Sequence, residues 1–161
     1  MSPKCHFVAT AAMFFLIAAA IAAPAANAAP IDDACALLTT AQISSATTVE
    51  FGAGIYVTPT FKKTCTWTIK KPAGKTARIV TLYLQGVDAH EGGKKQMVGA
   101  VNVIPVSGVG DDAYYLSIGP QVYLFVKKGS AAFKMSVYGD IPLETKEAME
   151  KTMSQQVVSH L

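Results

Sequence analysis

Arginine is nearly absent from this sequence: Arg78 is the only arginine among the 14 basic residues. Proteins that bind nucleic acids favour arginine, and those that bind single strands add aromatic side chains between the basic ones. The lysines here come in pairs, such as Lys62-Lys63 and Lys127-Lys128, beside expected turns or strand ends, where contact with water explains them. We therefore expect no nucleic acid partner, and the net charge of +3 leaves only a weak attraction to an acidic envelope surface.

Histidines and catalytic motifs are also scarce. After residue 28 the chain holds two histidines, His90 and His160, and no serine stands in a G-x-S-x-G elbow. Nucleophilic hydrolysis needs a nucleophile, a base and an orienting group within mutual reach. The sequence therefore favours a protein that is not an enzyme and has no cofactor. A small extracytoplasmic hydrolase with an unrecognised carboxylate site is the alternative.

No complete metal site is visible in the sequence. Asp88, His90 and Glu91 offer oxygen and nitrogen ligands, but no fourth ligand stands near them. The pair Asp111-Asp112 lacks the further acidic positions that a calcium loop requires. We therefore predict no metal, and we expect the two aspartates to accept hydrogen bonds from turn amides.

The spacing Gly108-x-Gly110-x-x-Ala113 matches a dinucleotide-binding fingerprint. That fingerprint needs a strand before it and a helix after it, so that the helix N-terminus meets the pyrophosphate. Here a strand is expected to follow, and two aspartates within the motif would repel phosphate. We therefore interpret residues 108–112 as a glycine-rich turn.

The longest apolar run, residues 7–23, follows the positive charge of Lys4 and precedes a small-x-small sequence that ends at Ala28. This order is typical of a secretory signal peptide. An uncleaved membrane anchor is the other interpretation, but the run is at the lower limit for spanning a bilayer. We expect a cleaved signal peptide over 1–28 and one secreted or periplasmic domain over 29–161, without stable membrane insertion.

Three cysteines are present, and no two of them have C-x-x-C spacing. Cys5 would leave with the signal peptide, and Cys35 and Cys65 remain as an even pair in an exported chain, which predicts one disulfide. Metal thiolates or a redox pair would need closer spacing or further ligands. The bridge would fasten a first helical segment to the strand face that also carries Trp67.

Hydrophobic periodicity predicts short helices and strands in the first half of the chain. Thr39 and Gln42 have the spacing of a capping box, which predicts a helix over 40–46 after a helical turn at 34–38. Alternating apolar residues predict strands at 55–57, 64–70 and 77–85. The segment 88–98 is ambiguous between a short helix and a loop, because two glycines weaken a helix there.

The second half contains the clearest strand pattern. After an extended segment at 101–106, three β-prone runs separated by turn residues predict an antiparallel meander with strands at 113–118, 121–126 and 131–138. A final helix over 142–160 carries an apolar residue at every fourth position. We therefore predict the α+β class: an antiparallel sheet of five to six strands with the N-terminal and C-terminal helices packed on one side.

The tyrosines give the only hint of a binding surface. Tyr114 and Tyr115 are neighbours in an expected strand, so they must point to opposite faces and cannot both belong to one core. The hypothesised recognition surface consists of Gly108, Gly110, Asp111, Tyr115 and Tyr123. Ordinary packing of the sheet, with tyrosine hydroxyls in water, is the simpler explanation.

Three short motifs resemble those of a known group: C-A-L-L-T from Cys35, C-T-W from Cys65 and G-V-G-D-D-A-Y from Gly108. The group comprises small exported bacterial proteins, the actinobacterial-type lipoproteins of unknown function that carry C-x-L-L-T and C-x-W. The resemblance implies a PsbP-like α+β sandwich and a Cys35–Cys65 bridge, and it implies no catalytic residues. This chain departs from the group because it lacks the cysteine that would carry the lipid.

These observations together predict an exported, non-catalytic domain that acts by binding. The expected partner is an envelope protein or a small apolar ligand, and a structural component of the envelope is a further alternative. A binding protein and an enzyme differ in their main pocket. An enzyme gathers polar groups with perturbed pKa values there, whereas a binding protein presents tyrosines and aliphatic side chains.

Overall fold

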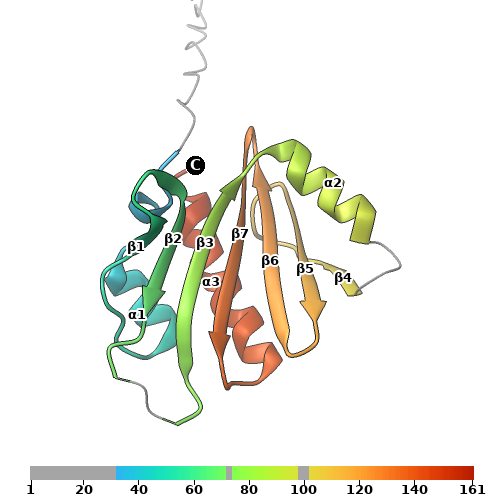
Figure 1. Ribbon diagram of the computed structural model, residues 1–161. Helices are drawn as coiled ribbons and strands as arrows, with labels where there is room; N and C mark the ends of the chain where they lie inside the picture. Colours follow the sequence, from blue (N-terminus) through green and yellow to red (C-terminus); the bar gives the residue numbers. More distant parts are fainter. Residues whose placement is uncertain (1–31, 72–73, 98–101) are drawn as a thin grey trace, which may run out of the picture.

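The computed structural model describes residues 32–71, 74–97 and 102–161. Its centre is one seven-stranded antiparallel sheet with the order β1-β2-β3-β7-β6-β5-β4 (Figure 1). The strands are β1 (Ile55–Thr58), β2 (Phe61–Thr68), β3 (Ala77–Gln85), β4 (Asn102–Pro105), β5 (Asp112–Ile118), β6 (Gln121–Lys128) and β7 (Ala131–Gly139). The expected signal peptide lies outside the described residues.

The described helical segments are η1 (Ala34–Ala36), α1 (Thr40–Thr47), α2 (Val87–Met97) and α3 (Leu143–Val158). The predicted capping box is confirmed at the start of α1. The Thr39 hydroxyl accepts a hydrogen bond from the Gln42 backbone N–H, and the Gln42 side chain accepts one from the Thr39 N–H. These two bonds satisfy backbone donors that the first helical turn leaves without partners, so local sequence is enough to begin α1 here.

The predicted meander is confirmed as β5, β6 and β7. Each strand pairs antiparallel with the next, and the two turns carry Gly119 and Gly129 with φ angles of 58° and 56°. Glycine adopts this left-handed conformation without the steric cost that a Cβ atom imposes. The turn chemistry of the sequence therefore decides where these strands reverse.

The sheet has seven strands, so the prediction of five to six was too low. The two strands at its edges, β1 and β4, have only four residues each, and β4 ends at Pro105. Such short segments give weak alternation, and proline is tolerated at a sheet edge because one side of the strand needs no ladder hydrogen bonds. Within the ambiguous segment over 88–98, residues 88–97 belong to the helix α2, and residue 98 lies outside the described residues.

Helices lie on both faces of the sheet. On the first face, here called the covered face, α3 packs across β6 and β7 and contacts α1 (Figure 1). Buried residues of both helices, such as Ile43 and Met153, join one core with strand residues such as Leu82 and Met135. On the second face, the His90 ring of α2 packs on Tyr114 of β5, at 5.0 Å between ring centroids. The N-terminal and C-terminal helices therefore share one side, while α2 covers part of the other.

The apolar stripe of α3 packs as expected, but polar residues accompany it. Met153 and Val157 are buried, and Met149 is partly buried against the same core. Glu150 and Ser154 of the same helix are buried too, each with no exposed surface. The stripe therefore carries a carboxyl and a hydroxyl into the interior, next to β6 and β7.

Candidate functional site

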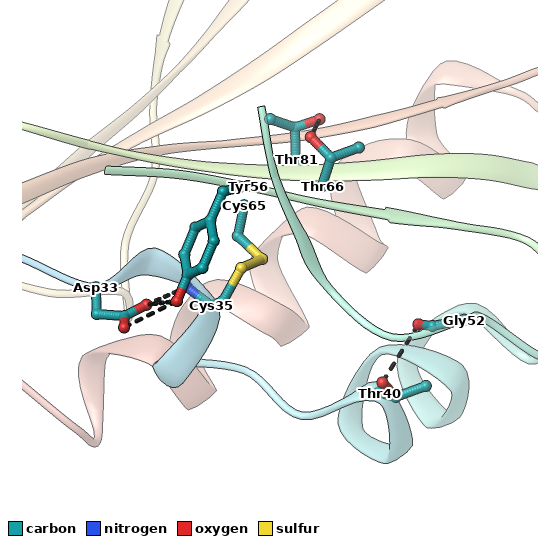
Figure 2. The surroundings of a disulfide bond; sticks show 8 residues. All are labelled: Asp33, Cys35, Thr40, Gly52, Tyr56, Cys65, Thr66 and Thr81. Carbon is teal, nitrogen blue, oxygen red and sulfur yellow. Dashed lines mark hydrogen bonds between the residues drawn. A yellow bond between two sulfur atoms is a disulfide. The ribbon is translucent and has the colours of Figure 1, made fainter. Parts of the chain in front are cut away.

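The predicted disulfide is confirmed. Cys35 of η1 and Cys65 of β2 are bonded, with their Cα atoms 5.0 Å apart, and Figure 2 shows the bridge between the two elements. Cys65 and Trp67 are both buried on the covered face, as their spacing predicted. The bridge therefore fastens the start of the domain to the core side of the sheet.

A hydrogen bond and a tightly packed glycine surround the disulfide. The Tyr56 hydroxyl donates to the carboxylate of Asp33, at 2.8 Å and 2.9 Å to its two oxygens (Figure 2). A Cβ atom on Gly54 would lie 2.7 Å from the Cys65 Sγ and 2.6 Å from the Trp67 Nε1, so only glycine fits there. The surroundings of the disulfide are thus filled by structural contacts, which is the expected environment of an inert bridge rather than a reactive one.

The structure does not gather the five residues of the hypothesised recognition surface on one face. Tyr115 is buried under α3, where its hydroxyl donates to the Glu147 backbone carbonyl at 2.6 Å. Tyr123 lies on the opposite face, because it pairs with Leu116 while Tyr115 pairs with Leu124. Tyr114, next to Tyr115, is buried under α2, so the expectation that these neighbours face opposite ways is confirmed.

The remaining three members of that surface form the loop before β5. Gly108 and Gly110 have φ angles of 79° and 62°, and a Cβ atom on Gly110 would lie 2.4 Å from the Lys127 carbonyl oxygen. The Asp111 carboxylate accepts hydrogen bonds from the Gly129 N–H and the Lys128 ammonium, and these bonds lower its pKa. This loop is therefore a glycine-dependent turn closed by an aspartate, as its sequence indicated.

An ion-pair cluster lies where α2 meets the start of β5. The Asp112 carboxylate binds the Lys94 ammonium at 2.8 Å and the His90 Nε2 at 3.0 Å, and both contacts lower the pKa of Asp112. Beside it, the Lys127 ammonium lowers the pKa of Glu91 by donating a hydrogen bond to its carboxylate. The cluster joins α2 to β5 and β6 through paired charges.

Three groups of this cluster could in principle ligate a metal ion. Ligand atoms of His90, Glu91 and Asp112 lie within 4.8 Å of one another, and Asp88 is an exposed residue that does not belong to the group. Each carboxylate is already neutralised by a lysine, and a cation would have to displace both ammonium groups. The His90 side chain is fully buried, with no hydrogen-bond partner for its Nδ1 among the described residues. We therefore interpret the cluster as structural.

A buried carboxyl fills a gap between two central strands. The β6–β7 ladder extends from the turn to the Leu124–Met135 pair, and beyond it the Val137 N–H donates to the Glu150 Oε1 at 2.9 Å. Burial raises the pKa of Glu150 to about 9, even though backbone N–H groups bind the carboxyl. The carboxyl is thus protonated at neutral pH and takes the place of a ladder partner.

The two faces of the sheet differ most in the part of the second face that α2 does not cover. There, residues of β2, β3 and β7 form a shallow depression of about 280 Å³. Its lining, here called the open face, consists of Thr64, Thr81, Tyr83, Lys134, Ser136 and Tyr138. Cross-strand pairing explains why they meet, since Thr64 pairs with Tyr83 and Tyr83 pairs with Lys134. Each of these six side chains carries an ammonium, a hydroxyl or a phenol group, and none of them is acidic.

Lys134 is the single charge in this lining. Its ammonium lies 5.7 Å from the centroid of the Tyr83 ring and 5.2 Å from that of the Tyr123 ring. Within the described part of the chain, no carboxylate lies within 4.0 Å of it, unlike Lys94 and Lys127. A cation over two aromatic rings is attracted by their electron-rich faces, so the rings hold the ammonium without neutralising it.

The Tyr138 phenol, which also lines the depression, stays neutral. The hydroxyls of Tyr123 and Tyr138 lie 3.3 Å apart, and the two rings meet edge to face. Burial and the neighbouring hydroxyl raise the pKa of Tyr138 to about 12. At neutral pH the open face therefore presents one positive charge among hydroxyl donors.

The sequence predicted the strand over 131–138, but it did not identify the open face. The signal that could have found it is the run of small polar and aromatic residues at alternate positions of β2, β3 and β7. Glu150 was also missed. The sequence signal for Glu150 was its position directly after Met149, which belongs to the apolar stripe of α3.

Comparison of the chain with protein-family models, with curated proteins and with solved structures found no match. Among the described residues, no helix has the length and apolar character that crossing a membrane requires. The function must therefore be argued from the open face and from the sequence.

Proposed function

We propose that this chain is an exported, non-catalytic binding protein whose binding surface is the open face. One observation carries the proposal: a hollowed part of the sheet has tyrosines and hydroxyls around a lysine that has no acidic partner among the described residues. Aromatic side chains with a polar tip are favoured at binding surfaces because they supply contact area and a hydrogen bond together. An envelope protein or a small apolar ligand is the proposed occupant.

Exposed apolar side chains next to the depression support this proposal. Ile79 pairs with Tyr138 and with Thr68 across the strands, and both Ile79 and Tyr138 are more than a third exposed. Phe61, also exposed, stacks on Tyr83 with 6.5 Å between ring centroids. These residues extend an apolar border around the polar floor, and a border of this kind would shield a bound molecule from water.

A hydrolase, the alternative activity, finds no support at the open face. General acid–base catalysis most often uses histidine or a carboxylate, and neither is among the described residues that line the depression. His90 and Glu150, whose surroundings are most unusual, are fully buried on the two opposite sides of the sheet. A purely structural envelope component differs from our proposal in needing no occupant for the open face.

Photo-crosslinking tests the proposed surface. A benzoylphenylalanine placed at Ile79 reports on the open face, and one placed at Thr152, an exposed residue of α3, reports on the opposite side. After irradiation of the exported protein in the envelope, we expect one defined adduct from position 79 and none from position 152. Equal adducts from both positions, or no adduct from position 79, would contradict the proposal.

The export part of the proposal has a separate test. The order of charge, apolar run and small residues before Ala29 supports cleavage, and a disulfide is typical of an oxidising compartment outside the cytoplasm. We expect the mature protein from a bacterium that expresses the full chain to begin at Ala29 when its intact mass is measured. A mass that includes residues 1–28 would show instead that the segment is retained.

A further inference from the structure

We infer that the open face takes a ligand with an anionic head group and a small apolar body, the head group lying against Lys134. The inference rests on the proposed function and states the chemical class of its ligand. It depends on the contrast between Lys134 and the ion-paired lysines of this chain, and on what surrounds its ammonium.

The first step is electrostatic. Lys94, Lys127 and Lys128 each lie within 4.0 Å of a carboxylate, whereas Lys134 has none at that distance within the described ranges. Lys134 is partly buried, so water reaches it incompletely. An ammonium in such a place gains more from an incoming anion than a fully solvated one does, because less hydration is lost on binding.

The second step is the supply of hydrogen bonds. Thr81 and Ser136 pair directly across β3 and β7, one row along the strands from Lys134 and Tyr83. The Thr81 hydroxyl lies 3.5 Å from that of Thr66, and the Tyr138 phenol lies 3.3 Å from that of Tyr123, so one hydroxyl of each pair stays free to donate to an oxyanion. Ser136 is buried beneath them, and the Lys134 ammonium supplies the charge. A carboxylate, sulfate or phosphate head group fits such a set of donors. A cationic head group would be repelled by the Lys134 ammonium, and an uncharged one would form no ion pair with it.

The third step is the apolar border. Ile79 and Phe61 are exposed at different sides of the tyrosine-lined floor, and the depression holds about 280 Å³. This volume is near the lower end of small-molecule sites in proteins, so it suits a head group with a short chain or one ring. The occupant we commit to is therefore a small amphiphilic acid rather than a polymer.

Three probes with the same tail and different heads test the inference: decanoate, decyl maltoside and decyltrimethylammonium, each below its micelle-forming concentration. Binding to the full mature chain is followed through backbone amide shifts of Tyr83, Ser136 and Tyr138. We expect decanoate to shift these amides and to bind about tenfold more tightly than the neutral maltoside, which is the effect of one charge-assisted contact. The cationic probe is expected to bind least.

A pair of matched variants assigns the effect to one residue. Lys134→Met removes the charge but keeps an unbranched chain over the rings, and it should weaken decanoate about tenfold without changing the affinity for the maltoside. Lys62→Met is the control, because the Lys62 ammonium also lies over a tyrosine ring, at 6.0 Å from the Tyr56 centroid, but outside the depression. It removes the same charge from the protein and should change neither affinity.

The outcomes separate the inference from the proposed function. If all three probes shift the open-face amides with equal affinity, the face binds apolar ligands and the inferred preference for anions is wrong. If Lys62→Met weakens decanoate as much as Lys134→Met does, the preference comes from net charge and the inferred site is wrong. If no probe shifts these amides, the inference is wrong, and crosslinking from position 79 alone decides whether a protein occupies the face.

Discussion

The two faces of the sheet use the same strands for different purposes. On the covered face, Leu82, Met135 and Val137 are fully buried beneath helices, and the disulfide pins η1 to the same side. On the other face, Thr81, Lys134 and Ser136 occupy the alternate positions of those strands, and α2 covers only one end. Because side chains alternate along a strand, one strand can build a core and a binding surface independently. The comparison predicts that stability depends on the covered face and binding on the open face.

On the covered face, we expect the largest effect from Glu150, which should make the free energy of unfolding depend on pH. Its pKa is about 9 in the folded protein, against an ordinary value of 4.5. Between these values the folded protein holds one more proton than the unfolded chain, so the free energy of unfolding falls as pH rises. The slope should reach up to about 1.4 kcal/mol per pH unit.

Urea unfolding of the native protein and of Glu150→Gln, measured from pH 5 to pH 9, checks this prediction. The glutamine carbonyl can still accept from the Val137 N–H, and the variant has no carboxyl to ionise. We therefore expect a flatter pH profile for the variant, which becomes the more stable of the two as pH rises. Parallel profiles for the two proteins would show that Glu150 does not titrate as described.

The disulfide should have the next largest effect. It joins residues 30 positions apart, for which the loop-entropy relation gives a stabilisation of about 3.5 kcal/mol. Unfolding of the native protein and of the double variant Cys35→Ser/Cys65→Ser, followed by fluorescence of the adjacent Trp67, measures it. The variant should still show the open-face ligand shifts where it is folded, since the bridge lies on the covered side. Equal stability of the two proteins would contradict the prediction.

Two neighbouring residues of β3 compare the faces directly. Leu82→Ala leaves a cavity in the core and should lower the free energy of unfolding by about 3 kcal/mol. Thr81→Ala, on the open face, should cost less than about 1 kcal/mol, because its side chain is only partly buried. Urea unfolding of both variants provides the measurement. Similar losses at the two positions would mean that the open face contributes to the core.

An effect of similarly small size is expected at the end of the second face that α2 covers. Asp112→Asn removes the charge that pairs with Lys94 and His90 and should cost about 1 kcal/mol at pH 7. The pKa of Asp112 is lowered in the folded protein, so this contribution is present above the ordinary carboxylate pKa and is lost as pH falls. The difference between native protein and variant, measured by thermal unfolding, should shrink below pH 4. A constant difference would argue against an ionic role for Asp112.

Sequence reasoning was most successful where a short stretch decides the structure. The capping box of α1 and the glycine turns around β6 could be predicted because each depends on residues within a few positions of one another. The edge strands were harder, since four residues give too little periodicity to count. The hypothesised surface around Tyr115 and Tyr123 mixed two faces, because residue alternation does not say which face a helix will cover.

By itself, the sequence determined that this chain forms an α+β fold with an antiparallel sheet and a Cys35–Cys65 bridge. Those features follow from periodicity, turn residues and an even cysteine pair, which can be recognised from neighbouring residues or from the composition. Only the tertiary structure decided that Glu150 enters the gap between β6 and β7, and that Lys134 lies over two tyrosine rings with no carboxylate of the described residues within 4.0 Å. These contacts depend on the order of strands across the sheet, and that order brings together residues that are distant in the sequence.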